Sequence, residues 1–268
     1  MDTRRKTNRV MELREKMVKG TAWSILSQAV RLLLRLGVVA ILARLLTPDD
    51  FGLIAMVTVF TNLLLLLNDL GIPAAIIQKQ DLGENQLSSA FWLNLAEGLA
   101  ITLIFIALAP LIAAFYSEDR LIAIVLVLSP TFLIASFGMI QFGLLSKWLD
   151  FKSLAMAEIL SALLAGVVAI VLAFADVGVW SLVFQALTAA FVLAVLLWFF
   201  CAWRPKLAFK WKHTAEILDY GLFLTGFQFS NYFNRNLDNL IIGRFLGSES
   251  LGFYDIAYKS LLFPLQNI

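Results

Sequence analysis

The chain has 268 residues, of which 60% are hydrophobic and only 15% are charged, and its mean hydropathy is +0.84. This composition describes a polytopic membrane protein. The pI near 8.7 says little about nucleic acid, because the basic residues cluster for reasons of membrane topology. A single cysteine, Cys201, excludes an internal disulfide framework and a cysteine-based metal cluster, and is interpreted as a packing residue at the end of an apolar run.

Residues 1–19 are rich in basic side chains and precede the first apolar run. An export or secretory signal is disfavoured, because the run that follows is too long and has no small-residue cleavage pattern. We interpret the segment as a cytoplasmic tail that fixes the orientation of the chain. Its cations are Arg4, Arg5, Lys6, Arg9, Arg14, Lys16 and Lys19.

Residues 20–73 are predicted to form a helical hairpin with its turn at Thr47-Pro48-Asp49-Asp50. Each arm is long enough to span, because about 20 apolar residues cross the hydrocarbon. The first arm carries Gln28, Arg31 and Arg35 at helical spacing, which places them on one stripe. Because each buried arginine costs roughly 2.5–3.5 kcal/mol, we expect this stripe to face other helices or a water-filled cavity.

The same hairpin returns 200 residues later in the chain. When residues 20–60 are placed over 220–260 without a gap, the short turns coincide and several residues are identical. These are Gln28 with Gln228, Arg35 with Arg235, Ile41 with Ile241, Arg44 with Arg244, Leu46 with Leu246 and Gly52 with Gly252. The second polar stripe consists of Gln228, Asn231, Arg235 and Asp238. The repetition indicates a two-half architecture of the kind that many transporters use.

Six further apolar segments follow the first hairpin, which predicts an all-α membrane protein with about eight transmembrane helices. They lie at roughly 88–115, 121–145, 154–175, 179–203, 216–246 and 251–268. The predicted parts are a cytoplasmic tail, a first six-helix bundle, a basic and aromatic cytoplasmic connection that lies on anionic lipid, and the incomplete start of a second bundle. Their bounds are 1–19, 20–203, 204–215 and 216–268.

The distribution of basic residues predicts the orientation of the chain. With the amino terminus in the cytoplasm, the inner segments hold fourteen Lys and Arg residues, whereas the outer turns hold only Arg120. Arg44 and Arg244 stand near the outer ends of their helices and are interpreted as reaching the lipid headgroups. Pro130 lies inside the fourth span and is expected to bend it.

Three acidic residues within the spans receive different interpretations. Glu97, about ten residues into the third span, is a candidate proton or cation site. Asp238 lies on the stripe of Arg235, so it is either an ion-coupling residue or a structural partner of that arginine. Glu158 lies near a cytoplasmic end and is interpreted as an interfacial residue.

Short motifs in both hairpins resemble a known family. The first hairpin contains Gly20-Thr-Ala-Trp-Ser, Ala43-Arg-Leu-Leu-Thr-Pro-Asp-Asp-Phe-Gly-Leu and Asn68-Asp-Leu-Gly-Ile. The second contains Asp238-Asn-Leu-Ile-Ile-Gly-Arg-Phe-Leu-Gly and Leu251-Gly-Phe-Tyr. These resemble polysaccharide exporters of the Wzx type, which belong to the MOP superfamily together with the multidrug exporters and the lipid II flippases.

The resemblance implies two bundles of six helices around a central cavity in the bacterial inner membrane. It implies movement of undecaprenyl-diphosphate-linked oligosaccharides to the periplasmic leaflet, for the synthesis of capsule, O-antigen, lipopolysaccharide or exopolysaccharide. The expected partners are this lipid-linked substrate, membrane lipids, a polysaccharide polymerase and chain-length proteins, with no nucleic acid. Since the second hairpin begins near residue 220, about four more helices are expected to complete a twelve-helix protein.

The two polar stripes suit such a substrate. A diphosphate needs cationic groups, and sugars need amides or hydroxyls. The candidates for substrate binding are Gln28, Arg31, Arg35, Gln228, Asn231, Asn234 and Arg235, and those for ion coupling are Asp238 and Glu97.

Two alternatives remain open. A multidrug exporter of the same architecture would favour an acidic or aromatic cavity. A polymerase or ligase of the polysaccharide pathway would need a sizeable outer loop with catalytic groups. No Walker A loop, metal-ligand spacing or nucleophile–base pair is found, so we expect no cofactor, no metal and no enzymatic activity.

Overall fold

The computed structural model of the chain describes Trp23, residues 26–69, 72–78 and 82–207, Tyr232, and residues 236–258. Among these residues there are helices and turns but no strand. Six helices in this part are long and apolar enough to cross a membrane, which confirms the prediction of an all-α polytopic membrane protein. They are Leu26–Leu45, Pro48–Gln78, Glu84–Tyr116, Arg120–Lys147, Phe151–Phe174 and Trp180–Phe200. The two spans expected after residue 215 fall largely outside the described residues.

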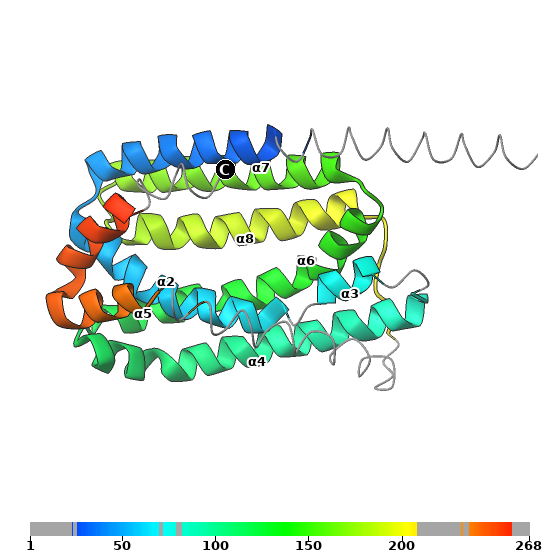
Figure 1. Ribbon diagram of the computed structural model, residues 1–268, viewed down its shortest axis with the longest axis horizontal. Coiled ribbons are helices and arrows are strands. Elements are labelled where there is room, and N and C mark those ends of the chain that lie inside the picture. The colour runs from blue at the N-terminus through cyan, green and yellow to red at the C-terminus, as the bar shows by residue number, and fades with distance from the viewer. Residues whose placement is uncertain are drawn as a thin grey trace, which may run out of the picture.

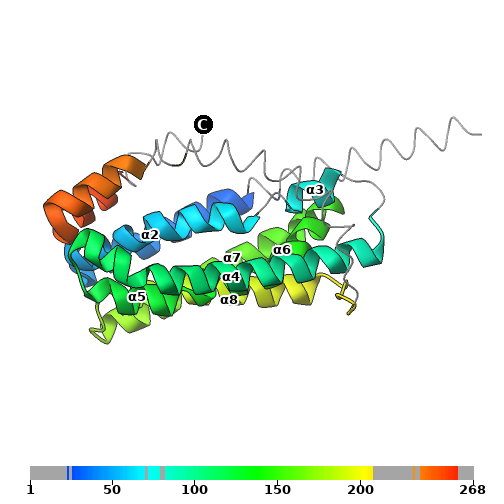
Figure 2. The same cartoon turned by 90° about the horizontal axis from the view of Figure 1, so that it is seen from below.

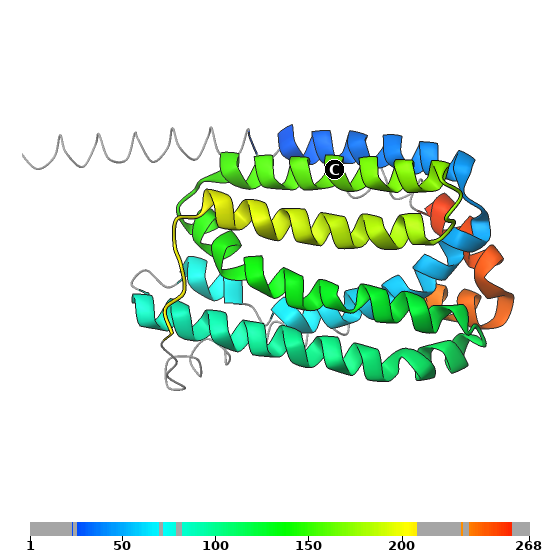
Figure 3. The same cartoon turned by 180° about the vertical axis from the view of Figure 1, so that it is seen from behind.

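The helices run back and forth along the long axis of an elongated bundle (Figure 1). After the helix Leu26–Leu45 come α2 (Pro48–Asp69), α3 (Ile72–Gln78), α4 (Glu84–Tyr116), α5 (Arg120–Leu128), α6 (Pro130–Lys147), α7 (Phe151–Phe174) and α8 (Trp180–Phe200). Figure 2 shows α2 on one side of α4, α5 and α8. From behind, α7 and α8 lie side by side along the bundle (Figure 3).

The two ends of the bundle differ, and each is named here by its connections. The turn end holds residues 46–50, 117–119 and 175–179, which connect neighbouring helices. The tail end holds the start of the helix Leu26–Leu45, the turn 148–150 and the segment that follows α8. Large apolar side chains such as Leu103, Val171 and Phe199 are exposed between the ends, as expected of surfaces that face lipid.

One of the spans is interrupted within the described residues. The span Arg120–Lys147 breaks at Ser129 into α5 and α6, which confirms the bend expected at Pro130. Proline has no N–H to donate, so carbonyls of the preceding turn need other donors. The carbonyl that Pro130 leaves without its helical donor is that of Leu126, four residues earlier, and the Ser129 hydroxyl donates to it at 2.8 Å. Residues 72–78 form α3, which continues the apolar run of α2 in the sequence.

A small polar cluster fixes α2, α4 and α6 against one another. Asn68, Asn94 and Ser136 have fully buried side chains. The Asn94 amide donates to the Asn68 carbonyl oxygen and the Ser136 hydroxyl donates to Asn68 Oδ1, both at 3.2 Å. A Cβ on Gly98 would lie 2.1 Å from Ser136 Oγ, so only glycine allows this approach. Because lipid and apolar side chains are alike in polarity, small residues and hydrogen bonds of this kind hold membrane helices together.

The segment after α8 folds back over the start of α4. The Lys206 backbone N–H donates to the Ser88 hydroxyl at 3.0 Å, and Trp92 Nε1 donates to the Lys206 carbonyl at 2.9 Å. Lys206 Nζ forms an ion pair with the Glu84 carboxylate. The described part of the connection is therefore held by protein contacts. Residues 208–215, the remainder of the stretch expected to lie on lipid, are outside the described residues.

An ionic cluster lies at the turn end. Arg120 Nη1 donates to Asp49 Oδ2 at 2.7 Å, while Arg120 Nε and Nη2 donate to the two oxygens of Glu118 at 2.7 and 2.8 Å. These bonds hold the pKa of the Glu118 carboxyl below its usual range, because they favour its charged form. The Ser248 hydroxyl donates to Asp49 Oδ1, so the cluster links the first hairpin to the second.

Two glycines allow the two hairpins to touch at the turn end. A Cβ on Gly52 would lie 1.7 Å from the carbonyl oxygen of Ser248, and a Cβ on Gly252 would lie 1.8 Å from the carbonyl oxygen of Pro48. No side chain fits at either place. The two contacts are equivalent under the repeat, because Gly52 meets Ser248 and Gly252 meets Pro48, which are the same two positions in opposite hairpins. An interface with two-fold symmetry has this property. The residues that the repeat pairs in sequence, Gly52 with Gly252, thus meet in space. We call this glycine contact the seam.

The described part of the second hairpin, residues 236–258, is helical without an interruption. At the short turn expected at 247–250, Gly247 has φ +82°. The orange ribbon of this segment changes direction in Figure 1. Glycine adopts this φ without the strain that a Cβ would cause. Arg244 Nη1 donates to the Ser117 hydroxyl at 2.8 Å, and Leu251 is fully buried, so both sides of the bend contact the first bundle.

Candidate functional site

A cavity of about 690 Å³ lies between the helix Leu26–Leu45, α2, α7 and α8, with α5 and α6 closing one side. This volume falls in the usual range for sites that bind small molecules or headgroups. Most of its lining residues are apolar. The polar ones are Gln28, Arg31, Arg35, Thr58, Thr61, Asn62, Thr131 and Gln185.

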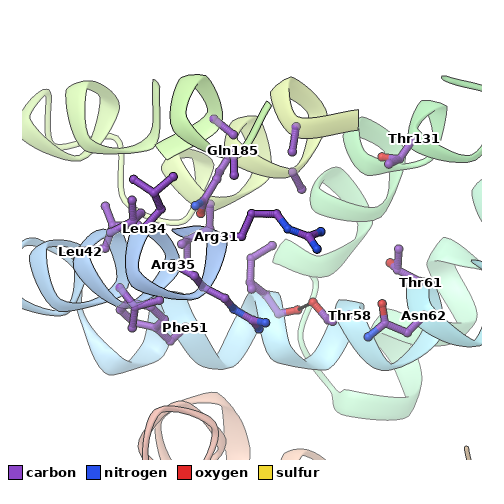
Figure 4. A pocket seen from close by; sticks show the side chains of 18 of the residues that line it. Arg31, Leu34, Arg35, Leu42, Phe51, Thr58, Thr61, Asn62, Thr131 and Gln185 are labelled. Carbon is purple, nitrogen blue, oxygen red and sulfur yellow. Dashed lines mark hydrogen bonds between the residues drawn. The ribbon is translucent and has the colours of Figure 1, made fainter. Parts of the chain in front are cut away.

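The helix Leu26–Leu45 supplies one cationic wall of the cavity. Gln28, Arg31 and Arg35 all line it, as expected from their spacing along one face of the helix. Figure 4 shows both guanidinium groups extending from this helix toward the side where α2 carries Thr58 and Asn62. The three residues therefore line a space between helices, as their stripe predicted, while their role in substrate binding stays a prediction.

The two arginines differ in their contacts. Arg31 Nη1 lies 3.1 Å from Glu158 Oε2 on α7, and this ion pair joins two walls of the cavity. Arg35 is exposed to the cavity and has no ion pair with any residue that the structure describes. No acidic side chain is among the residues that line the cavity, so its charged lining is cationic.

The opposite wall offers hydrogen-bond acceptors. The hydroxyls of Thr58 and Thr61 donate back to the carbonyls of Ile54 and Val57 in their own helix, at 2.7 and 3.0 Å. Their donor is thereby used, while each oxygen keeps a lone pair for a ligand in the cavity. The amide of Asn62 adds both a donor and an acceptor. The cavity thus combines guanidinium donors with hydroxyl and amide groups, which is the chemistry that binds an anionic group attached to a polyol.

Several lining residues escaped the sequence analysis. Thr58, Thr61 and Asn62 follow one another at helical spacing in an apolar run, and this pattern would have identified them. Gln185 lies in α8 at helical spacing from Ser181 and Thr188, so the same kind of pattern would have marked it. Glu158, interpreted from sequence as interfacial, forms the ion pair with Arg31, which lies far away in the sequence.

The remaining predicted site residues lie elsewhere. Glu97 is half-buried on α4 and does not line this cavity. Asp238 also lies apart from it and accepts a hydrogen bond from the Tyr254 hydroxyl at 2.5 Å. Gln228, Asn231, Asn234 and Arg235 are outside the described residues, as is any pairing of Arg235 with Asp238. Their roles stay predictions.

Comparison with known proteins gives one family match. Residues 41–268 match the model of a family described as polysaccharide biosynthesis protein. The chain is 30% identical over 260 residues to the teichuronic acid biosynthesis protein TuaB of Bacillus subtilis. This alignment covers 95% of the chain and 53% of TuaB. It is 31% identical over 260 residues to the lipopolysaccharide biosynthesis protein WzxC of Escherichia coli, and this alignment covers 95% of the chain and 52% of WzxC.

A third relative is the succinoglycan biosynthesis transport protein ExoT of Rhizobium meliloti, which is 25% identical over 250 residues, or 93% of the chain and 51% of that protein. The chain therefore spans about half the length of the curated relatives it matches. No solved structure matches the chain at a significant level.

Proposed function

Because the chain belongs to the polysaccharide biosynthesis protein family, we propose that it moves oligosaccharides linked to undecaprenyl diphosphate across the bacterial inner membrane. The cargo would serve the synthesis of a surface polysaccharide, such as capsule, O-antigen or exopolysaccharide. The cavity would hold the diphosphate and the nearest sugars, while the polyprenyl tail stays in the bilayer.

The cationic cavity is the observation that carries this proposal. Arg31 and Arg35 reach into a space between membrane-spanning helices, and no acid is among the residues that line it. Placing a guanidinium at this depth costs free energy, which a structural role for Arg35 does not repay because it has no ionic partner among the described residues. A diphosphate would supply that partner, since its oxygens match the fork of a guanidinium.

The hydroxyl and amide wall supports the sugar part of the substrate. Thr58, Thr61, Asn62 and Gln185 present oxygen and nitrogen atoms across the cavity from the arginines. A sugar ring carries several hydroxyls that would be left without hydrogen bonds in hydrocarbon, and leaving such groups unpaired is costly. Each contact is weak enough that the substrate can leave again.

Alternating access is the proposed mode of movement. The seam brings the two hairpins together at the turn end, where Gly52 and Gly252 meet the opposite backbones. In the proposed cycle, this arrangement is the state in which the turn end is closed. Transport would require the seam to separate, so that the cavity opens toward the other face of the membrane.

Two other functions fit the cavity less well. A multidrug exporter with cationic substrates would place carboxylates in the cavity, whereas the charged lining residues are Arg31 and Arg35. A polymerase or ligase would need a catalytic domain outside the membrane, whereas the described turns 117–119 and 175–179 are too short to hold one. We therefore propose a transporter and not an enzyme.

Export by variants of Arg35 tests the proposal. In a flippase-deficient strain that carries the complete gene, Arg35→Ala should abolish surface polysaccharide while the protein stays in the membrane, because removal of a costly cation does not hinder insertion. Arg35→Lys should keep partial export, since lysine retains the charge but loses the two-pronged grip on phosphate oxygens.

Arg44→Ala is the matched control for this experiment. Arg44 is exposed on the same helix, does not line the cavity, and should be dispensable for export. Surface polysaccharide is measured by immunoblotting and the membrane level of each variant by an epitope tag. Full export by Arg35→Ala at a normal membrane level would overturn the anionic-cavity mechanism.

The orientation of the chain is a separate part of the proposal. With the amino terminus in the cytoplasm, the turn end faces the periplasm. A cysteine at Ala175, which is exposed at the turn end, should react with an impermeant thiol reagent added to intact cells. One at Leu207, which is 93% exposed at the tail end, should react only after the membrane is opened. Cys201 is buried and serves as the unreactive background, and labelling of the 207 variant from outside would reverse the orientation.

A further inference from the structure

Glu158 and Arg31 form an ion pair in an unusual place. Glu158 lies seven residues after the start of α7 at Phe151, which puts it about 10 Å along the helix from the tail end. Arg31 lies on the helix Leu26–Leu45 and meets Glu158 from that side. Both side chains are partly accessible, at 37% for Arg31 and 22% for Glu158, so the pair is not sealed within the protein. Arg31 lines the cavity, and Glu158 reaches it only through this contact with Arg31.

The pair leaves most of the guanidinium unused. Arg31 has five N–H donors, and Nη1 is the atom at ion-pair distance from Glu158, 3.1 Å from Oε2. Arg31 Nε is buried and has no hydrogen-bond partner among the residues that the structure describes. A structural arginine–carboxylate pair would favour the two-bond fork, which is stronger and fixes the geometry. A single contact holds the guanidinium in place but is easily exchanged for another anion.

The balance of charge around the cavity favours such an exchange. The two arginines and Glu158 together carry a net charge of one positive unit, and Arg35 has no described partner. An anion in the cavity would bind the Arg35 guanidinium, which has no described ionic partner, and would compete with Glu158 for Arg31. The binding free energy that the anion gains from the Arg31 guanidinium is reduced by the loss of the ion pair with Glu158. The affinity of the cavity for the anion therefore stays moderate.

We propose that Glu158 is a displaceable counter-ion, which holds Arg31 while the cavity is empty and yields it to the diphosphate of the substrate. This assignment rests on the proposed function of the cavity. Glu158 thereby positions Arg31 and limits the affinity of the cavity for anions, so that a substrate bound from one leaflet is released to the other. The ligand class is a polyprenyl diphosphate.

Binding of undecaprenyl diphosphate to the purified full-length protein tests this proposal. In Glu158→Gln the competitor for Arg31 is neutral, so the diphosphate should bind about fivefold more tightly, as expected when a partly exposed ion pair no longer has to be broken. Binding of uncharged undecaprenol should not change. Export in cells should fall, because release becomes slower. In an Arg31→Gln background the additional Glu158→Gln change should no longer affect binding.

Glu84→Gln is the matched control, because it breaks the pair with Lys206 at the tail end, away from the cavity. If Glu158→Gln binds the diphosphate no more tightly while Arg35→Ala loses binding, Glu158 is only a structural partner and the proposed function stands. If neither variant changes binding, the proposed function itself fails. Glu158→Asp, which keeps the charge, should behave like the unchanged protein, and a fivefold gain in that variant would also contradict the counter-ion role.

Discussion

The turn end and the cavity both contain arginines, but the guanidinium groups differ in how many carboxylate partners they have. At the turn end, Arg120 donates to Asp49 and to both oxygens of Glu118. In the cavity, Arg31 has one ionic contact, and Arg35 has none with the part of the chain that the structure describes. The seam fills the turn end with backbone against backbone, whereas the cavity leaves about 690 Å³ of space.

This difference separates structural from functional arginines. Arg120 lies at the end of a span, where water is near, and its carboxylate partners satisfy it. Arg31 and Arg35 lie between spans, where an under-paired cation is expensive. A guanidinium between spans with few protein partners is best explained by a ligand that binds it. We therefore expect substitutions at the turn end to reduce stability and substitutions in the cavity to reduce transport.

The largest effect is expected from Gly52→Ala. Its Cβ would lie 1.7 Å from the Ser248 carbonyl oxygen, so the two hairpins would have to move apart. Overpacking of this kind costs about 1–3 kcal/mol. Gly252→Ala should cost a similar amount, because its Cβ meets the Pro48 carbonyl oxygen in the same manner. Thermal unfolding in detergent and the membrane level of each variant measure the loss.

Gly37→Ala provides the control for the seam, because a Cβ at Gly37 meets no atom within 4 Å. Its helix should tolerate the change or become slightly more stable, since alanine favours helices more than glycine does. Equal stability of the Gly37 and Gly52 variants would mean that the seam does not form in the membrane. The turn end would then not be the stabilising region of the protein.

A smaller effect is expected from Arg120→Ala. Arg120 is partly exposed, so removal of its ion pairs should lower the free energy of unfolding by about 1 kcal/mol. Binding of undecaprenyl diphosphate should be unchanged, because Arg120 is not among the residues that line the cavity. Calorimetry measures the first quantity and equilibrium binding the second. Arg35→Ala should give the reverse result, so loss of diphosphate binding in Arg120→Ala would remove the distinction between the two arginines.

Much of the fold was accessible from sequence because it depends on local patterns. Long apolar runs predicted the first six spans, and Pro130 predicted the break between α5 and α6. The motifs of the two hairpins indicated the Wzx-type polysaccharide family, and the family match confirms that resemblance. The change of direction at Gly247 coincides with the short turn that the sequence predicted at residues 247–250, because glycine adopts a positive φ without strain.

The candidate site was accessible only in part. The stripe of Gln28, Arg31 and Arg35 follows from a helical period of 3.6 residues, and arginines are easily recognised within an apolar run. Thr58 and Gln185 also lie in helical patterns of polar residues, but neutral polar side chains are common in membrane helices and these patterns were overlooked. Glu158 near a helix end suited an interfacial position equally well.

The sequence by itself determined which segments cross the membrane, which helix face carries the arginines, and which glycines of the two hairpins correspond. These properties depend on hydropathy and periodicity within one segment or on direct comparison of two segments. Only the tertiary structure decided that Arg31 meets Glu158 and that Gly52 meets Ser248. Contacts between distant helices depend on how whole helices cross and rotate against one another, and a rotation of one helix changes every partner without changing any local pattern.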